Sequence, residues 1–347
     1  ETDRKSEIMI FSRRIQVENY TLFFLRLIYM PNKKLKTFKK DNSCKKTKTY
    51  ITREDSLSFY ISDEIASYGN NGKKPFIVYY DNLDYSIRLL KGDCITILNQ
   101  ARENSVDMIF ADPPYFLSNG GITCHAGKMV SVNKGEWDKS KGIQENHKFT
   151  LEWLKVCQRV LKPNGTIWVS GTTHIIYSIG FAMQELGYKI LNDIIWYKRN
   201  APPNLSCRYF THSTEIILWA AKNEKSKHYF NYQLMKKMNQ GKQMRNVWEI
   251  STPSAEEKKF GKHPTQKPVE LLTRILLAST KEGDLVLDPF CGSSTTGVAA
   301  IALNRKYVGI DLDDEYLQLS KKRLEETIKK ALVKDKKEGL LCKTTSL

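Results

Sequence analysis

The sequence predicts an α/β fold with a mainly parallel sheet, and three observations lead to this prediction. From about Pro75 onward, short apolar runs alternate with amphipathic stretches of roughly ten to fifteen residues, as strands alternate with helices in such folds. Two of the apolar runs end on an acid, at Asp112 and at Asp288. No internal repeat is visible, so a solenoid is not indicated.

Each element follows from a local pattern of apolar residues. Alternating or continuous apolar runs of strand length predict strands, and apolar residues at helical spacing predict helices. In chain order, we expect a strand, a Gly-Asp turn and a helix at 86–98, and then, within 106–115, a buried strand that ends at Asp112. A helix, a Lys-Pro-Asn-Gly turn and a strand follow at 150–172, and two more strands at 187–200 and 213–222. The last elements are a helix at 267–280, a strand at 283–290, a helix at 294–304, a strand at 306–311 and a long closing helix at 314–332.

The composition is that of a globular protein with an unusual charge. Hydrophobic residues make up 41% and charged residues 27% of the 347 residues, but 55 Lys and Arg against 38 Asp and Glu give a formal net charge of +17. This charge favours a polyanionic partner, with a generally basic protein as the alternative. Seven scattered cysteines without a C-x-x-C pair favour a reducing cytosol over a disulfide framework or a zinc site. The apolar stretch 20–30 contains Arg26 and is too short to span a bilayer, so we expect no membrane segment.

The chain divides into a folded domain and two basic ends. We expect a basic extension over residues 1–75, because the first fifty residues carry 13 Lys and Arg against 5 Asp and Glu. This arm either contacts the polyanion or is only solvated. The domain itself is expected over 76–330 and a basic tail over 331–347. Between 200 and 260 polar, basic and aromatic residues interrupt the alternation, which indicates an inserted segment.

Residues 283–311 carry the pattern of a nucleoside-binding β-α-β unit. A buried strand ends at Asp288, a turn of small residues follows, a helix begins near Thr295, and Asp311 ends the next strand 23 residues after Asp288. Amides of such a turn can approach an anionic group while the distant acid bonds a ribose diol. Only Gly292 precedes the helix, so the dinucleotide fingerprint is absent. A tight turn without a ligand is the alternative.

The segment IFADPPYFLSNGG (109–121) is expected at the same edge of the sheet as that unit. Asp112 is a hydrogen-bond acceptor, and Pro113 and Pro114, which lack an N–H, leave their carbonyls free to accept. Tyr115 offers a flat ring for stacking. Together these groups form a clamp for a planar group that bears an amine; a merely stiff turn is the alternative.

Three motifs in one order resemble a known family. DPPY at 112–115, HPTQKP at 263–268 and DPFCGSSTTG at 288–297 are similar to the motifs of the S-adenosylmethionine-dependent amino-methyltransferases of DNA. The catalytic loop comes 176 residues before the cofactor turn, as in the circularly permuted beta group of adenine-N6 and cytosine-N4 enzymes of bacterial restriction-modification systems. The resemblance covers residues 78 to 325 and implies a Rossmann-like methyltransferase sheet, with residues 200–260 as the target-recognition insertion.

The resemblance also implies a cofactor site for S-adenosylmethionine. Its residues would be Asp93 and Cys94 at the adenine, Asp311 at the ribose, Phe290, Gly292, Ser293 and Ser294 at the methionine and sulfonium, Thr265 and Lys267 at the carboxylate, and Asp112 near the methyl group. Asp93 has a helix cap as its alternative role. The family usually has glycine at Ser294, so a positive φ there would strain the serine by about 1–3 kcal/mol. No metal is implied.

The resemblance further implies that the enzyme flips its target base out of the duplex. The catalytic residues would be Asp112, Pro113, Pro114 and Tyr115. The base and DNA contacts would be Tyr115, Trp196, Tyr197, Lys198, Arg199 and Arg208, with the loop 118–138 helping the insertion to read the target. Trp196 and Tyr197 could instead belong to the core of the sheet.

The resemblance favours adenine N6 as the methylated amine, because cytosine-N4 members more often open the tetrapeptide with serine where this chain has Asp112. The alternatives are cytosine N4, RNA, a protein glutamine, or a catalytically silent DNA-binding module that has kept the fold. The expected partner is double-stranded DNA, with a cognate restriction endonuclease and a homodimer as further expectations. The resemblance places the protein in the bacterial cytoplasm, at the nucleoid.

Overall fold

The computed structural model describes residues 76–344, except for 83–85, 119–121, 126–127 and 132–137. The predicted basic extension 1–75, with its apolar stretch, and the last residues 345–347 lie outside the described residues. Among the described helices, none combines the length and the apolar character that crossing a membrane requires.

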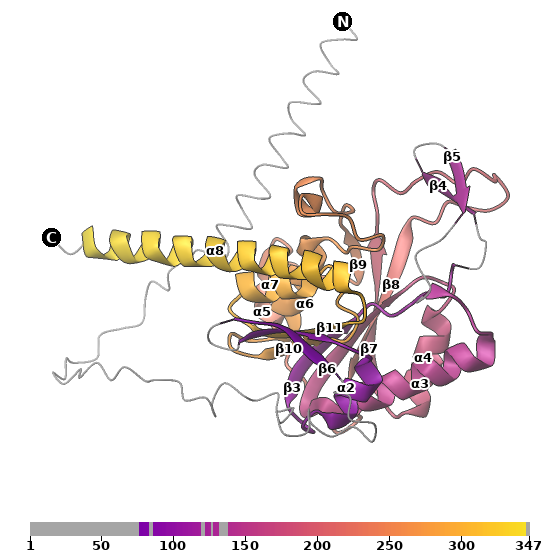
Figure 1. Ribbon diagram of the computed structural model, residues 1–347, viewed down its shortest axis with the longest axis horizontal. Helices are drawn as coiled ribbons and strands as arrows, with labels where there is room; N and C mark the ends of the chain where they lie inside the picture. The colour runs from indigo at the N-terminus through magenta and orange to yellow at the C-terminus, as the bar shows by residue number, and fades with distance from the viewer. Residues whose placement is uncertain (1–75, 83–85, 119–121, 126–127, 132–137, 345–347) are drawn as a thin grey trace, which may run out of the picture. The chain divides into compact units, whose positions relative to one another are not determined.

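One large mixed sheet forms the centre of the described residues (Figure 1). Its order is β1-β2-β11-β10-β3-β6-β8-β7-β9. The pairs from β2 through β11, β10 and β3 to β6 are parallel, whereas β1 and β8 run antiparallel to their neighbours. The strands are β1 (Ile77–Asp81), β2 (Ile87–Lys91), β3 (Val106–Ala111), β6 (Leu161–Gly171), β7 (Lys189–Tyr197), β8 (Thr214–Ala221), β9 (Val247–Glu249), β10 (Leu285–Asp288) and β11 (Lys306–Asp311). A separate hairpin pairs β4 (Ile122–His125) with β5 (Lys128–Ser131).

Helices cover both faces of the large sheet (Figure 1). One face carries α2 (Cys94–Gln100), α3 (Ile143–Val160) and α4 (Ile176–Glu185). The other face carries α6 (Val269–Ser279), α7 (Thr295–Ala302) and α8 (Asp314–Thr344), with α5 (Tyr232–Met238) packed against α6. A short 3₁₀ turn, η3 (Glu256–Lys258), precedes α6.

The apolar pattern explains how these layers pack. In α3, the buried residues Trp153, Leu154, Cys157 and Val160 recur at helical spacing, so they form one stripe against the sheet. In β3 nearly every side chain is buried, because helices cover the strand on both sides and its sequence is therefore almost continuously apolar. The two faces of the sheet thus form two apolar cores.

The chain changes direction between β3 and β10, and this change positions the site. From β10 it passes through α7 to β11 on one side, whereas from β3 it passes through α3 to β6 on the other side. Because α7 and α3 cover opposite faces, a crevice is expected at the carboxyl ends of β3 and β10. Asp112 and Asp288 lie at those two ends.

The predicted α/β fold with a mostly parallel sheet is confirmed, with differences in detail. The expected turn before residue 166 is a bulge inside β6, where the pairing with β3 passes from Leu161 directly to Thr166. The closing helix extends beyond residue 332 to Thr344, through most of the predicted tail. The range 200–260 is not one inserted segment, since β8 within it is a sheet strand between β6 and β7. Its backbone hydrogen bonds to both neighbours make β8 part of the framework.

Candidate functional site

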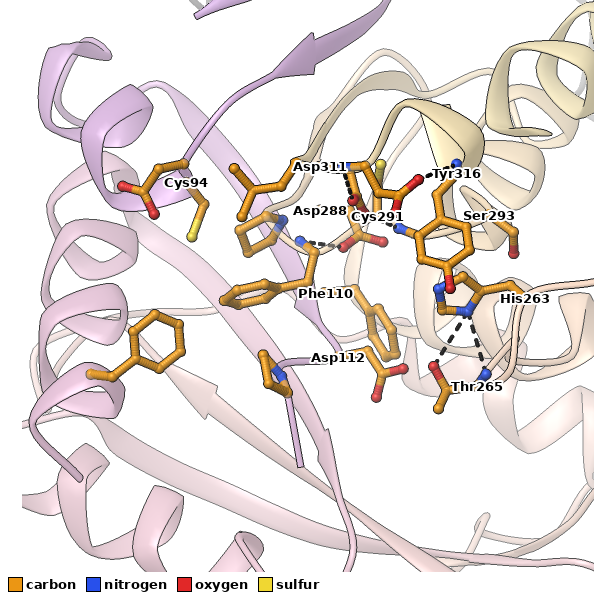
Figure 2. A pocket seen from close by; sticks show the side chains of 18 of the residues that line it. Cys94, Phe110, Asp112, His263, Thr265, Asp288, Cys291, Ser293, Asp311 and Tyr316 are labelled. Carbon is orange, nitrogen blue, oxygen red and sulfur yellow. Dashed lines mark hydrogen bonds between the residues drawn. The ribbon is translucent and has the colours of Figure 1, made fainter. Parts of the chain in front are cut away.

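A cavity of about 950 Å³ opens at the carboxyl edge of the sheet. Its walls come from the start of α2, the turn after β3, the segment before α6 and the turns after β10 and β11. Figure 2 shows Asp112, Asp288 and Asp311 around this cavity, with Cys94 on one side and His263 and Tyr316 on the other. Segments more than two hundred residues apart in the sequence therefore build one site.

Two carboxylates hold the turn after β10. Asp288 is buried and accepts hydrogen bonds from the Phe290 N–H at 3.2 Å and the Thr296 hydroxyl at 2.6 Å. Asp311 accepts from the Gly292 N–H at 2.8 Å and from the Asp313 N–H at 3.0 Å. Burial raises the pKa of Asp288 to about 7 and that of Asp311 to about 6, against the opposing effect of these hydrogen bonds.

Gly292 has a positive φ of 49° and lies against the imidazole of His263. A Cβ at this position would come within 2.9 Å of the His263 Nε2 atom, so a side chain cannot be added without moving the ring. The same ring contacts Thr265 through Nδ1 at 3.3 Å and packs edge-on against Tyr316, with ring centroids 4.3 Å apart. His263 thus joins the turn after β10 to the HPTQKP segment, a role that the sequence did not reveal.

Two side chains of α8 fix the same turn from behind. The Ser320 hydroxyl donates to the Gly292 carbonyl at 2.7 Å. The buried guanidinium of Arg323 donates to the Ser293 carbonyl at 2.5 Å, to the Ser293 hydroxyl at 2.8 Å and to the Thr295 hydroxyl at 3.0 Å. In the sequence, Ser320 and Arg323 stand only among the residues of an amphipathic helix. That pattern does not show whether a side chain hydrogen-bonds to the turn or packs in the core.

Ser294 adopts the left-handed conformation in which a serine side chain is strained, with φ 51° and ψ 43°. The residue is fully buried, its N–H donates to the Cys291 carbonyl at 2.6 Å, and its hydroxyl accepts from the Tyr307 hydroxyl at 3.1 Å. The hydrogen bond to Tyr307 accounts for a serine here, because glycine would relieve the strain but leave the tyrosine hydroxyl without this acceptor.

We expect Ser294→Gly to be more stable than Ser294→Ala by about 1 kcal/mol, because both variants lose the hydroxyl but only alanine keeps a Cβ in the left-handed region. Urea unfolding of both variants measures the difference. Equal free energies of unfolding would show that this turn carries no strain from its side chain.

Aromatic rings form an apolar wall beside the turn. Phe290 packs edge-on against Trp153, with ring centroids 5.5 Å apart, and lies 6.4 Å from the ring of Phe149. Phe149 in turn meets Phe116 at 6.2 Å. Phe116, Phe149 and Phe290 all line the cavity, which gives an apolar ligand part a surface to pack against.

The start of α2 closes another part of the wall. Asp93 caps this helix, because its carboxylate accepts from the Thr96 N–H and the Thr96 hydroxyl, both at 2.8 Å. The capping role is therefore confirmed, and Asp93 lines the cavity as well. Cys94 lines it beside Asp93, and burial raises the pKa of its thiol, so the thiol stays neutral.

The turn after β3 carries a buried network of charges. Asp112 accepts from the Tyr115 hydroxyl at 2.6 Å and forms an ion pair with Lys267 at 2.5 Å. Lys267 lies 3.7 Å from Glu215 and is only 6% exposed. Burial alone would lower the pKa of Lys267, but the attraction of Asp112 and Glu215 outweighs it and raises this pKa. The structure thus places Lys267 beside Asp112 as well as in the cavity wall.

Glu215, which the sequence did not single out, connects this network to Lys198 just after the end of β7. Its carboxylate pairs with Lys198 and lies 3.5 Å from the hydroxyls of Tyr115 and Ser170. Burial, followed by the charge of Asp112, raises the pKa of Tyr115. The one feature of the sequence that could have indicated Glu215 is its position as a charged residue at the start of an otherwise apolar strand.

The predicted DNA-facing residues separate into different environments. The expectation that Trp196 lines the target-base pocket is wrong, because its ring is 2% exposed in the core and its indole N–H donates to the Ile250 carbonyl at 2.8 Å. The next residue of the strand, Tyr197, directs its side chain to the opposite face of the sheet and is 39% exposed. Lys198 lies over Trp196 and pairs with Glu215, whereas Arg199 is exposed and pairs with Glu249 at 2.5 Å. Arg208 is exposed in the β7–β8 loop.

Tyr115 is 5% exposed, because its hydroxyl points into the buried network. Pro114 lines the cavity beside it, and Pro113 is buried. In the part of the chain that the structure describes, no cluster of His, Cys, Asp and Glu side chains could hold a metal ion.

The residues present fit S-adenosylmethionine. Asp112, Asp288 and Asp311 line the cavity, so a cationic ligand with hydroxyl groups meets acceptors of opposite charge. The aromatic wall accommodates apolar parts of the ligand, and Gly292 and Ser293 of the turn after β10 line the same cavity. The volume suits a ligand of this size.

Comparisons with known proteins agree with this geometry. A family model described as DNA methylase matches residues 106–322. The chain is 58% identical over 238 residues to the Type II methyltransferase M2.DpnII of Streptococcus pneumoniae, a match that covers 68% of this chain and 89% of that protein. It is 51% identical over 248 residues to the Type II methyltransferase M2.MboI of Moraxella bovis, with 72% of this chain and 91% of that protein covered.

Solved structures show the same fold. The M1.HpyAVI–SAM complex has 32% sequence identity and a TM-score of 0.53, and the match covers 69% of this chain and 98% of that one. The cytosine-N4-specific PvuII DNA methyltransferase has a TM-score of 0.55 at 22% identity, with 68% of this chain and 86% of that one covered. At this identity the second likeness concerns the fold alone.

Proposed function

Since the chain belongs to the DNA methylase family and is an S-adenosylmethionine-dependent DNA methyltransferase, we propose that its acceptor is the N6 amine of an adenine flipped out of a short duplex sequence. The observation that carries this proposal is the position of Asp112. Its carboxylate follows β3 at the carboxyl edge of the sheet, lines the cofactor cavity and opens a Pro-Pro turn.

In this proposal, Asp112 and a proline carbonyl of the turn accept the two N–H bonds of the amine. The lone pair of an exocyclic amine is delocalised into its ring, and two acceptors draw the nitrogen towards a tetrahedral shape that frees the lone pair. When bound, S-adenosylmethionine supplies a methyl group on a sulfonium, which is already strongly electrophilic. Positioning and electrostatics therefore provide most of the acceleration, and neither a metal nor a covalent nucleophile is needed.

The ion pair with Lys267 bears on the role of Asp112 in the reaction. The Lys267 ammonium contacts one oxygen of the Asp112 carboxylate and holds it in place, so that the carboxylate can accept a hydrogen bond from the amine before transfer. The Tyr115 hydroxyl donates a hydrogen bond to the other oxygen of Asp112 and so orients the carboxylate. The proton leaves the methylated nitrogen after transfer, to Asp112 or to water.

We propose Tyr115, Tyr197 and Arg208 as the contacts of the flipped base and its strand. Tyr197 ends β7 and Ala111 ends β3 at the same edge of the sheet, so an exposed ring at Tyr197 stands on the side where the DNA must approach. Arg208 is exposed on the adjoining loop and suits a phosphate. The ring of Tyr115 is 5% exposed in this structure, so this proposal requires that the ring becomes accessible when the base enters beside Asp112 and stacks on it.

Adenine is favoured over cytosine by the acid that opens the tetrapeptide at Asp112. We further propose that the chain modifies DNA alongside a cognate restriction endonuclease, acts as a homodimer, and resides at the nucleoid in the bacterial cytoplasm. The relatives named as Type II methyltransferases support the restriction-modification context.

Mass spectrometry of nucleosides tests this proposal. Duplex DNA is incubated with the purified protein and isotopically labelled S-adenosylmethionine and is then hydrolysed. We expect label in N6-methyladenine. Label in N4-methylcytosine would keep the mechanism and replace the base, whereas no label in DNA while the cofactor binds would direct the search to RNA or a protein glutamine. DNA binding without any cofactor binding would indicate a silent module.

A further inference from the structure

Asp138 is a fully buried acid that lies outside the cofactor cavity and has no part in the mechanism above. In the chain it comes after the β4–β5 hairpin and 20 residues after Ser118. Its side chain points back to the residues immediately after Pro114. A buried carboxylate is costly unless its oxygens accept hydrogen bonds, so its partners indicate why it is there.

The partners are consecutive groups of the catalytic turn. One oxygen of Asp138 accepts from the Tyr115 N–H at 2.9 Å and from the Phe116 N–H at 2.8 Å. The other accepts from the Leu117 N–H at 3.2 Å and from the Ser118 hydroxyl at 2.8 Å. The Asp138 carbonyl also accepts from the Ser118 N–H at 3.2 Å.

This arrangement is an anion nest that the protein fills with its own side chain. Consecutive N–H groups can converge on an anion when a residue among them takes the left-handed conformation, and Phe116 has a positive φ of 57°. A left-handed phenylalanine is strained, so the turn needs an anion at its centre to stay in this shape. Asp138 supplies that anion.

The turn carries two side chains whose directions matter to the site. Tyr115 directs its hydroxyl to Asp112, while the next residue, Phe116, directs its ring into the cavity wall. The backbone that Asp138 holds lets these two adjacent residues face the network and the cavity, respectively. We propose that Asp138 is a positioning residue for methyl transfer, which sets the catalytic turn by accepting three successive backbone N–H groups. This inference rests on the proposed function of the turn.

The test compares Asp138→Asn with a matched control, Asp107→Asn. The amide at 138 keeps one accepting oxygen and places a donor where the other oxygen faced Leu117 and Ser118. Asp107 also accepts a backbone N–H, from Leu285 at 2.9 Å, and pairs with Lys162, but it lies near the start of β3, at the other edge of the sheet.

At a temperature where both variants are folded, we expect Asp138→Asn to lower the turnover number about 10- to 100-fold, with little change in the Kd of the cofactor or of DNA. Asp107→Asn should stay within about 3-fold of wild type. Hydrogen exchange should accelerate at the amides of 115–117 in the first variant alone. Equal losses in both variants that follow their melting temperatures, or unchanged exchange, would overturn the proposal.

Ser118→Ala provides a second route if Asp138→Asn does not fold. It removes one of the bonds to the carboxylate, so we expect a smaller fall in turnover and faster exchange at Leu117. Wild-type turnover with wild-type exchange would then reject the role of Asp138. A wild-type enzyme that methylates no DNA would instead refute the proposed function, while the exchange measurement would still decide what Asp138 holds.

Discussion

Asp112→Asn is expected to lower the single-turnover rate of methyl transfer by about 10²- to 10³-fold while cofactor binding largely survives. The amide is nearly isosteric, but it lacks the negative charge and offers one accepting oxygen instead of two. The carboxylate now accepts from Tyr115 and Lys267 and must also accept from the substrate amine. Rapid-quench kinetics at saturating cofactor and DNA, with calorimetry of cofactor binding, measure both quantities.

The fold should tolerate this change, because Lys267 retains Glu215 at 3.7 Å as a partner. The matched control is Asp81→Asn, whose carboxylate pairs with Arg88 at 2.7 Å on the β1–β2 pair, and it should leave the rate near wild type. A lost affinity for the cofactor in Asp112→Asn would assign the residue to cofactor binding. An unchanged rate would remove it from catalysis.

Asp311→Asn is expected to weaken cofactor binding about 10- to 100-fold, because hydrogen bonds to a charged group contribute about 1.5–3 kcal/mol. The carboxylate lines the cavity and is oriented by the N–H groups of Gly292 and Asp313. Calorimetry gives the Kd. Asp284→Asn is the control, since Asp284 immediately precedes β10 and lies outside the cavity. Equal affinities of wild type and Asp311→Asn would exclude a ribose contact.

The pH dependence gives a second readout for the same residue. The pKa of Asp311 is raised to about 6, so the folded protein without cofactor holds a proton on this carboxyl at lower pH. Because the folded state binds this proton more tightly than the unfolded state, the bound proton stabilises the fold, and this stabilisation is lost as the pH rises through about 6. A hydroxyl donor binds the anion better, so cofactor affinity should increase between pH 5 and 7. The increase in affinity should be smaller in Asp311→Asn. In this variant Asp311 no longer titrates, and of the two acids Asp288, with a pKa of about 7, remains.

The framework of the site was predictable because its signals are local. Apolar runs that end at Asp112, Asp288 and Asp311 place three acids at the ends of parallel strands, and parallel strands end at one edge of a sheet. The positive φ of Ser294 was stated only as a condition, based on the glycine that the resembled family usually has there, because a serine by itself does not favour the left-handed region.

The environment of a strand residue was less predictable, because it depends on whether its side chain faces the core or the solvent. Trp196 and Tyr197 are adjacent and equally aromatic, yet one is in the core and the other is exposed, because successive strand residues face opposite sides. The sequence indicated neither which of the two faces the core nor that β8 lies between β6 and β7. Strand order is set by the packing of whole layers.

By itself, the sequence determined the family, the order of the motifs and the acids that open and close them, since these are written in short segments. Only the tertiary structure decided how those acids are held. Lys267 reaches Asp112 across 155 residues, Arg323 reaches Ser293 across 30, and Asp138 reaches Tyr115 across 23. Such contacts arise because burying a charge requires a partner, and the fold alone determines which distant side chain comes close enough to serve.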